Sequence, residues 1–417
     1  MLAIIVVISC LMGARAFERQ ALLTPEAQHV IQNSGGDAAE ISTVSGLRPS
    51  RHGKCGASKG FVALGDSYSA GIGTGVNGTE NDCRQGLHAH PQMIAADCGP
   101  IAFQFLSCTG AGTANVMVGG EESQLDHFNT SLPVDFALLS VGGNDLGFFE
   151  VMNACVFRFY NFYSGTCETA LNHSRTLLES DEFEIRLRVV ITEILDAVKW
   201  EKKPDFAITV TGYARFFNEL TDGCDDMSFG VWWNGPKLTK ALRSAMNTLV
   251  LAVNAKIRGT VAQINADFTS DKVFFVDHDE AFDGHRFCEL NVTEPDYARN
   301  DTWFFLVGGQ DNARNATLPQ HSSGVKTLPP TSPLVDPLSC LGPAYKSGDW
   351  GVLALCYMAV AKHYDPTLRF ARGDIVAQNS MWYVPTYYGK TFHPRSLGHE
   401  AMRDKIYEMW RSRDKSR

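Results

Sequence analysis

The chain has 417 residues, of which 44% are hydrophobic and 11% aromatic, enough apolar material for one large core or two modest ones. This composition excludes a mainly disordered chain. The formal net charge is -9 and the sequence has no basic cluster, which argues against a nucleic acid or an anionic membrane surface as partner.

The first residues have the features of a secretory signal peptide. An apolar segment, residues 2–13, is too short to span a bilayer, and Ala14-Arg15-Ala16 follows it as a cleavage site. No basic segment precedes the apolar run, so a short buried segment stays as the alternative. We expect removal of residues 1–16, a secreted extracellular protein and no integral membrane association.

Residues 17–57 are polar, rich in Gly, Ser and Ala and without a sustained period, which indicates a propeptide or a flexible N-terminal arm. Residues 58–412 are expected to form a single domain. Within it, residues from about 286 to 390 have many Pro, Gly and aromatic residues and no regular alternation of strand and helix patterns. We interpret this segment as a cap-like insertion.

Short apolar runs alternate with helical patterns along the domain. Apolar residues recur at helical spacing over residues 184–199 and again over 238–257. Because strands alternate with helices, we expect an α/β fold whose parallel sheet is covered by helices on both faces. The predicted buried strands are Phe61–Leu64, Ile101–Leu106, Phe136–Val141, Phe206–Val210 and Val273–Val276.

Three predicted strands end in residues suited to acyl chemistry, at the sheet edge where ligands of such folds bind. The first strand runs into Gly-Asp-Ser67, the second into Ser-Cys-Thr-Gly110 and the third into Gly-Gly-Asn144-Asp. Gly110 or Asn144 alone is better explained as part of a turn, and the Gly-Asp-Ser motif alone could arise by chance. Together they offer a serine nucleophile and three donors to an oxyanion, namely the amides of Ser67 and Gly110 and the side-chain NH2 of Asn144.

His393 is the candidate general base among the twelve histidines. It directly precedes Pro394, which fixes the start of a C-terminal amphipathic helix and leaves the histidine on the loop before it. The ordinary pKa of histidine lies near neutrality, as a general base requires. His399 falls inside the helix, where we expect a packing or hydrogen-bonding role.

The cysteines and the glycosylation sequons support export. Removing Cys10 with the signal peptide leaves ten of the eleven cysteines, an even number, and none lies in a CxxC pair. Disulfides therefore explain them better than a metal site. Six sequons predict a glycoprotein, and they begin at Asn77, Asn129, Asn172, Asn291, Asn300 and Asn315.

The order of the motifs resembles the SGNH (GDSL-type) hydrolase superfamily and, within it, secreted actinobacterial and fungal lipase-like members. The shared blocks are GDS ending at Ser67, then Gly110, then GGND around Asn144, then FHP around His393 with a following GH, over roughly residues 58–410. The resemblance implies a three-layer α/β/α flavodoxin-like fold with a five-stranded parallel sheet of order 2-1-3-4-5. It also implies a secreted esterase or lipase without cofactor or metal, with an acyl-enzyme on Ser67, His393 as base and an oxyanion hole from Ser67, Gly110 and Asn144.

One position departs from the family pattern. The family usually has an aspartate three residues before the histidine, and Lys390 stands there in this chain. A lysine side chain cannot accept the imidazole N–H. Some secreted relatives orient the histidine through the main-chain carbonyl at this position, so we expect a Ser67–His393 dyad in which the Lys390 carbonyl has that role.

The resemblance also implies the disulfides Cys83–Cys108, Cys155–Cys167 and Cys224–Cys288. The pairs Cys55–Cys98 and Cys340–Cys356 then remain, although sequence alone does not determine the connectivity.

Several alternatives stay open. The expected substrate is a small-molecule or lipid carboxylic ester, and the expected state is a monomer. The rival functions are a polysaccharide acetylesterase-like enzyme and a catalytically silent binding protein of the same fold.

Trp232-Trp233 could line an acyl or sugar pocket or pack a cap. His88-Ala-His90 is expected on a surface loop rather than in a metal site. The G-x-S-x-G motif at residues 56–60 precedes a strand, which is the wrong context for a nucleophile elbow.

Overall fold

The structure of the protein is a computed structural model that describes most of the predicted domain. The predicted signal peptide (1–16), the predicted arm (17–57), much of the predicted insertion and Trp232-Trp233 lie outside the described residues, so the domain boundaries stay predictions. The described residues are 59–75, 81–120, 122–157, 166–230, 235–307, 309–313, 336–343, 356, 360, 363 and 386–416.

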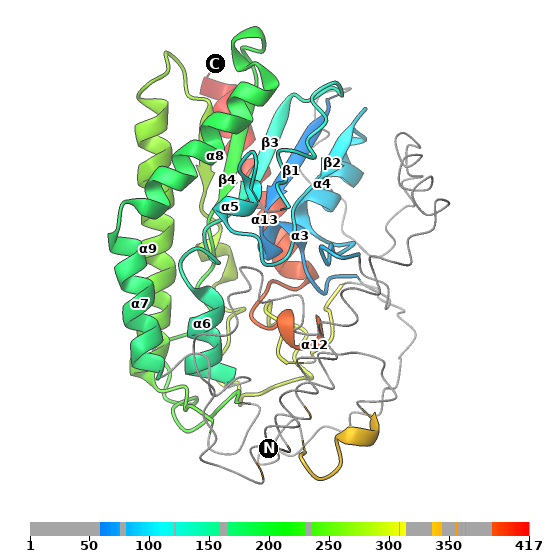
Figure 1. Ribbon diagram of the computed structural model, residues 1–417. Coiled ribbons are helices and arrows are strands. Elements are labelled where there is room, and N and C mark those ends of the chain that lie inside the picture. The colour runs from blue at the N-terminus through cyan, green and yellow to red at the C-terminus, as the bar shows by residue number, and fades with distance from the viewer. Residues whose placement is uncertain are drawn as a thin grey trace, which may run out of the picture. The chain divides into compact units, whose positions relative to one another are not determined.

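A five-stranded parallel sheet lies at the centre of the described fold (Figure 1). The strand order is β2-β1-β3-β4-β5, and every neighbouring pair is parallel. The predicted α/β fold with sheet order 2-1-3-4-5 is confirmed, and the strand ends differ from the predicted ones by no more than two residues. The strands are β1 (Phe61–Gly65), β2 (Phe103–Phe105), β3 (Phe136–Ser140), β4 (Ala207–Thr211) and β5 (Val273–Val276).

The helices include those that the apolar periodicity predicts, since α8 covers most of residues 184–199 and α9 contains most of 238–257. The longer helix, α9, begins after Thr239, whose side chain accepts the amide hydrogen of Leu242. None of the described helices combines the length and the apolar character needed to cross a membrane. The helices are α3 (Ser67–Ala70), α4 (His90–Cys98), α5 (Thr113–Val116), α6 (Phe148–Met152), the π-helical η1 (Asn153–Phe157), α7 (Cys167–Glu179), α8 (Glu182–Val198), the 3-10 helices η2 (Trp200–Lys202) and η3 (Asp279–Phe282), α9 (Lys240–Asn265), α12 (Thr386–Gly389) and α13 (Ser396–Ser416).

Successive residues of β1 point to opposite faces of the sheet, and each face has its own helices. Val62 and Leu64 lie in the larger core, together with buried residues of α7, α8 and α9. Phe61 and Ala63 lie in a second core with residues of α4 and α13. Figure 1 shows α7, α8 and α9 gathered on one side. The fold therefore has three layers, helix on sheet on helix, and leaves the carboxyl ends of the strands to the connecting loops.

Disulfides fix several of these loops. The three pairs implied by the family resemblance are confirmed. The remaining pair within the predicted insertion, Cys340–Cys356, is confirmed as well. Cys98 is also disulfide-bonded, while its expected partner Cys55 lies outside the described residues. The pairs described are Cys83–Cys108, Cys155–Cys167, Cys224–Cys288 and Cys340–Cys356.

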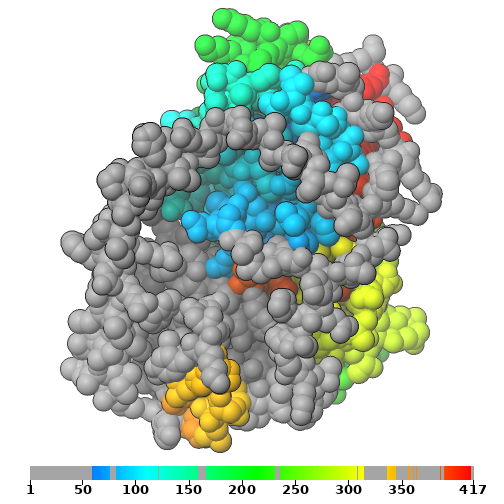
Figure 2. All heavy atoms as spheres, turned by 90° about the vertical axis from the view of Figure 1, so that its right-hand side faces the viewer, coloured from blue at the N-terminus to red at the C-terminus, as the bar shows by residue number. Residues whose placement is uncertain are grey.

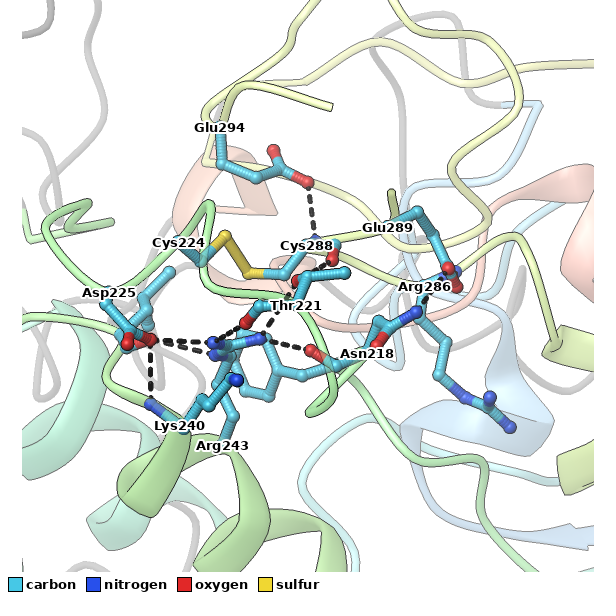
Figure 3. Close-up of a disulfide and its surroundings, with 12 residues drawn as sticks. Asn218, Thr221, Cys224, Asp225, Lys240, Arg243, Arg286, Cys288, Glu289 and Glu294 are labelled. Carbon is cyan, nitrogen blue, oxygen red and sulfur yellow. Dashed lines mark hydrogen bonds and ion pairs between the residues drawn. A yellow bond between two sulfur atoms is a disulfide. The ribbon is translucent and has the colours of Figure 1, made fainter. Parts of the chain in front are cut away.

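The Cys224–Cys288 disulfide joins the segment after β4 to the segment after η3 (Figure 3). Beside it, the fully buried guanidinium of Arg243 on α9 donates to the Thr221 carbonyl at 2.6 Å and to the Asp225 carboxylate at 2.7 Å. The carboxylate and carbonyl partners offset the free energy lost when the charged guanidinium is removed from water. This loop is thus held on the end of α9.

Candidate active site

Ser67 lies directly beyond the carboxyl end of β1, as the first residue of the one-turn helix α3. Gly65 turns the chain there with a φ of 123°, and a Cβ at Gly65 would lie 2.0 Å from the Ser140 carbonyl oxygen. Only glycine fits this position. Both backbone groups of Gly65 are paired with the Gln124 side chain at 2.8 Å. The sequence therefore builds a rigid turn that presents the serine.

His393 is the residue that faces this serine. Its Nε2 lies 2.7 Å from the Ser67 Oγ, although the two residues are 326 positions apart. The loop before α13 carries the histidine, and Phe305 holds this loop through two backbone hydrogen bonds, one to the Phe392 amide at 2.9 Å and one to the His393 carbonyl at 3.0 Å. Ser67 and His393 are both buried, at 7% and 3% exposure.

Carbonyl groups surround the other side of the imidazole. Nδ1 of His393 lies 3.2 Å from the Thr391 carbonyl oxygen, while the Lys390 carbonyl accepts the backbone N–H of His393 at 2.9 Å. A proton on Nδ1 leaves Nε2 free to accept the serine hydrogen. Burial lowers the pKa of His393 from 6.5 to about 4, against hydrogen bonds to the Thr391 and Lys390 carbonyls that raise it. The sequence predicts the Lys390 carbonyl as the group that orients the ring, and it gives no signal for the contact with the Thr391 carbonyl.

The Gly110 and Asn144 loops meet beside the serine turn. Asn144 donates one side-chain hydrogen to the Ala111 carbonyl at 2.9 Å, so the second hydrogen of its NH2 group stays available. The Asp145 carboxylate accepts the amide of Thr113 at 3.0 Å and its hydroxyl at 2.5 Å. Among the described residues, no group accepts the amide hydrogens of Ser67 or Gly110. Within the described part of the chain, the amides of Ser67 and Gly110 and the second side-chain hydrogen of Asn144 therefore remain available to a ligand.

A buried carboxyl group lies beneath the serine. Asp66 accepts hydrogen bonds from the Tyr68 amide at 3.0 Å, the Ser140 hydroxyl at 3.2 Å and the Tyr213 hydroxyl at 2.6 Å. Tyr213 in turn accepts the amide hydrogen of Gly143 at 3.0 Å, which links the serine turn to the GGND loop. Burial raises the pKa of Asp66 from 3.8 to about 7, against hydrogen bonds from Tyr213, Tyr68 and Ser140 that lower it.

Sequence reasoning missed this supporting network and placed one segment wrongly. Tyr213 follows β4 without any motif around it, so only its position after a strand end could have marked it. His88-Ala-His90 was expected on a surface loop, but His88 is 8% and His90 1% exposed, and His90 starts α4. Among the residues that the structure describes, no group of three or more His, Cys, Asp or Glu side chains could hold a metal ion.

A 2-1-3-4-5 parallel sheet with a serine and a histidine paired at the carboxyl ends of its strands is an arrangement typical of three-layer α/β hydrolases. No family model matches the chain. Lipase 1 of Streptomyces coelicolor is 34% identical over 162 residues, 39% of this chain and 54% of that protein, so the match spans about half the length of this relative. A lipase of Streptomyces rimosus is 27% identical over 230 residues, 55% of this chain and 73% of that protein.

Among solved structures, phospholipase A1 from Streptomyces albidoflavus NA297 is 30% identical, with a TM-score of 0.43, over 56% of this chain and 84% of that one. An extracellular lipase from Streptomyces rimosus is 26% identical, with a TM-score of 0.42, over 57% of this chain and 90% of that one. The two Streptomyces lipases point to the SGNH (GDSL-type) hydrolase superfamily.

Proposed function

We propose that the protein is a secreted serine esterase or lipase that hydrolyses carboxylic esters through an acyl-enzyme on Ser67. The observation that carries this proposal is the 2.7 Å contact between Ser67 Oγ and His393 Nε2. A hydroxyl is a poor nucleophile at neutral pH unless a base removes its proton as it attacks. The relatives named lipase and phospholipase A1 support the ester as substrate class.

In the first half-reaction, Ser67 Oγ attacks the ester carbonyl carbon and its proton passes to His393 Nε2. The amides of Ser67 and Gly110 and the Asn144 side chain donate to the oxyanion. The imidazolium then gives its proton to the leaving alcohol as the carbon–oxygen bond breaks. In the second half, His393 takes a proton from the water that attacks the acyl carbon. The imidazolium returns this proton to Ser67 Oγ as the bond from the acyl carbon to Oγ breaks and the acid leaves.

The surroundings of His393 favour this dyad in both protonation states of the ring. The low pKa of His393 keeps the ring neutral and ready to accept a proton at neutral pH. When the ring becomes charged, the Thr391 carbonyl oxygen, 3.2 Å from Nδ1, accepts its hydrogen bond and stabilises the imidazolium. A carbonyl thus supplies part of what the absent aspartate supplies elsewhere.

Export and glycosylation are part of the proposal. The disulfides support an oxidising compartment. The sequon asparagines among the described residues are all exposed, as N-glycosylation requires; they are Asn129, Asn172, Asn291 and Asn300. A mobility shift of the secreted protein after enzymatic removal of N-glycans tests this part.

The test of the activity is labelling by a fluorophosphonate probe, which reacts with activated serines. We expect labelling of the intact protein, its loss in Ser67→Ala and in His393→Ala, and turnover of nitrophenyl esters. No labelling and no turnover of the folded protein would instead support the silent binding protein. Turnover across acyl chains of rising length, beside acetylated xylan, separates a lipase from a polysaccharide acetylesterase.

A further inference from the structure

The carboxylate of Asp311 connects the two halves of the candidate site. Its Oδ2 accepts the amide hydrogen of Gly75 at 2.8 Å and the hydroxyl hydrogen of Ser396. Its Oδ1 accepts the Ser396 amide at 2.9 Å. Gly75 lies in the loop that follows α3, the helix of Ser67, and Ser396 is the first residue of α13, just after His393. One side chain therefore ties the serine segment to the histidine segment.

The surroundings keep this carboxylate buried and charged. The Asp311 side chain is only 4% exposed. Burial raises the pKa of Asp311, but hydrogen bonds from His88, Ser396 and Gly75 outweigh it and hold the pKa well below its usual range. Nδ1 of His88 lies 2.8 Å from the Ser396 hydroxyl and 3.5 Å from the carboxylate. The negative charge also faces the N-terminus of a 21-residue helix, which favours an anion.

The neighbouring residue strengthens the same connection. The side-chain oxygen of Asn312 accepts the Leu397 amide at 3.0 Å, and its NH2 group donates to the Asn300 carbonyl at 2.9 Å. The first two amides of α13 are thus capped from one short segment. Figure 2 shows this side of the molecule, where the yellow segment that ends at residue 313 lies beside the blue segment that follows β1.

We propose that Asp311 is the positioning carboxylate of this site, which holds the His393 loop against the Ser67 loop in a chain that has lysine where the family has its aspartate. The inference rests on the proposed function. Asp311 touches neither reacting atom, so it is not a catalytic residue. It sets the relative position of the two segments, and an error of about 1 Å between nucleophile and base costs on the order of 100-fold in rate.

The variant Asp311→Asn tests this role. The carboxylate accepts from Gly75 through one oxygen and from the Ser396 amide through the other, whereas a carboxamide accepts through one oxygen only. We expect kcat on a nitrophenyl ester to fall about 100-fold with KM little changed. The rate of fluorophosphonate labelling should fall in parallel.

Glu294→Gln is the matched control for lost stability. Glu294 is 2% exposed, and its two oxygens accept the amides of Cys288 and Asp296 at 3.1 Å, beside the Cys224–Cys288 disulfide (Figure 3). We expect both variants to lower the melting temperature and only Asp311→Asn to lower kcat. Equal kcat in the two variants, with both folded and the unchanged protein active, overturns the inference and leaves the proposed function intact.

Ser396→Ala decides the question if Asp311→Asn does not fold. This variant removes the hydroxyl that donates to Asp311 and keeps the Ser396 amide, which donates to Oδ1. The proposal predicts a smaller but measurable fall in kcat with unchanged KM. A folded Ser396→Ala variant with unaltered kcat and labelling rate overturns it. Absence of labelling and turnover in the unchanged protein would instead contradict the proposed function itself.

Discussion

Tyr68 donates its hydroxyl hydrogen to the Phe392 carbonyl at 2.9 Å, so the residue after the candidate nucleophile holds the residue before the candidate base. Phe392 is fully buried and has a φ of 64°, a left-handed conformation that a bulky side chain rarely adopts. Such a conformation persists only where its surroundings hold it. The Tyr68 hydroxyl is one of those restraints.

Tyr68→Phe should lower both stability and turnover. The substitution leaves the buried Phe392 carbonyl without its hydroxyl donor, which costs about 1–3 kcal/mol of unfolding free energy. Because the carbonyl belongs to the residue before His393, kcat should fall as well. Denaturant unfolding and ester hydrolysis measure the two effects. Tyr407→Phe is the control, since the Tyr407 hydroxyl donates to Asp97 in the α4–α13 layer and its loss should reduce stability alone.

The acid limb of kcat/KM should lie near pH 4 rather than near the ordinary value of 6.5. Burial lowers the pKa of His393 to about 4, so Nε2 accepts a proton at every pH above that value and loses this ability as the pH falls through it. The pH dependence of kcat/KM reports the free enzyme. Asp66 titrates closer to neutrality, so the profile is also measured in Asp66→Asn; a limb that stays at pH 6.5 in this variant contradicts the prediction.

Asp66 should make the folded state more stable in acid. Its pKa is 3.8 ordinarily and about 7 in the fold, so the stabilisation is complete below about pH 3.8 and is lost as the pH rises through about 7. Tyr213→Phe removes a hydrogen bond that lowers the Asp66 pKa, and the loss should extend to higher pH. Urea unfolding on both sides of neutrality measures this. An unchanged pH dependence in Tyr213→Phe would contradict it, and Asp66→Asn should abolish it.

Asn144→Ala should lower kcat by about 10²–10³ with little change in KM. The side chain loses its donor to the oxyanion, which develops only in the transition state. It also loses the anchor to Ala111, so thermal unfolding is recorded alongside. If the substitution raised KM and left kcat unchanged, Asn144 would bind substrate or shape its loop without stabilising the oxyanion.

The sheet could be predicted because its strands are buried on both faces and appear in the sequence as continuous apolar runs. Val273–Val276 is a strand over the predicted residues, and Phe136–Val141 ends one residue early at Ser140. Ser67, Gly110 and Asn144 could be selected because parallel strands bring their carboxyl ends to one edge. Their order along the chain, together with the family resemblance, selects them, and their catalytic roles stay predictions.

The groups that hold the histidine could not be predicted in this way. Asp311 lies in an irregular segment, and no periodicity marks the fold-back that brings it to Gly75 and Ser396. The contact from Nδ1 to the Thr391 carbonyl depends on the left-handed backbone at Phe392, which nothing in that residue's own preference indicates. His88 was placed at the surface because its buried partners are distant in sequence.

The separation of 326 residues between Ser67 and His393 has a consequence for assembly. The serine follows the first described strand and the histidine follows the last described one, so β2 to β5 all lie between the two residues in the chain. Contacts between such distant positions form late, because the entropy of a very long loop is lost before they reward it. If Ser67 and His393 form the proposed dyad, a refolding chain should recover its circular dichroism well before its turnover, because Ser67 has no base until the contact with His393 forms.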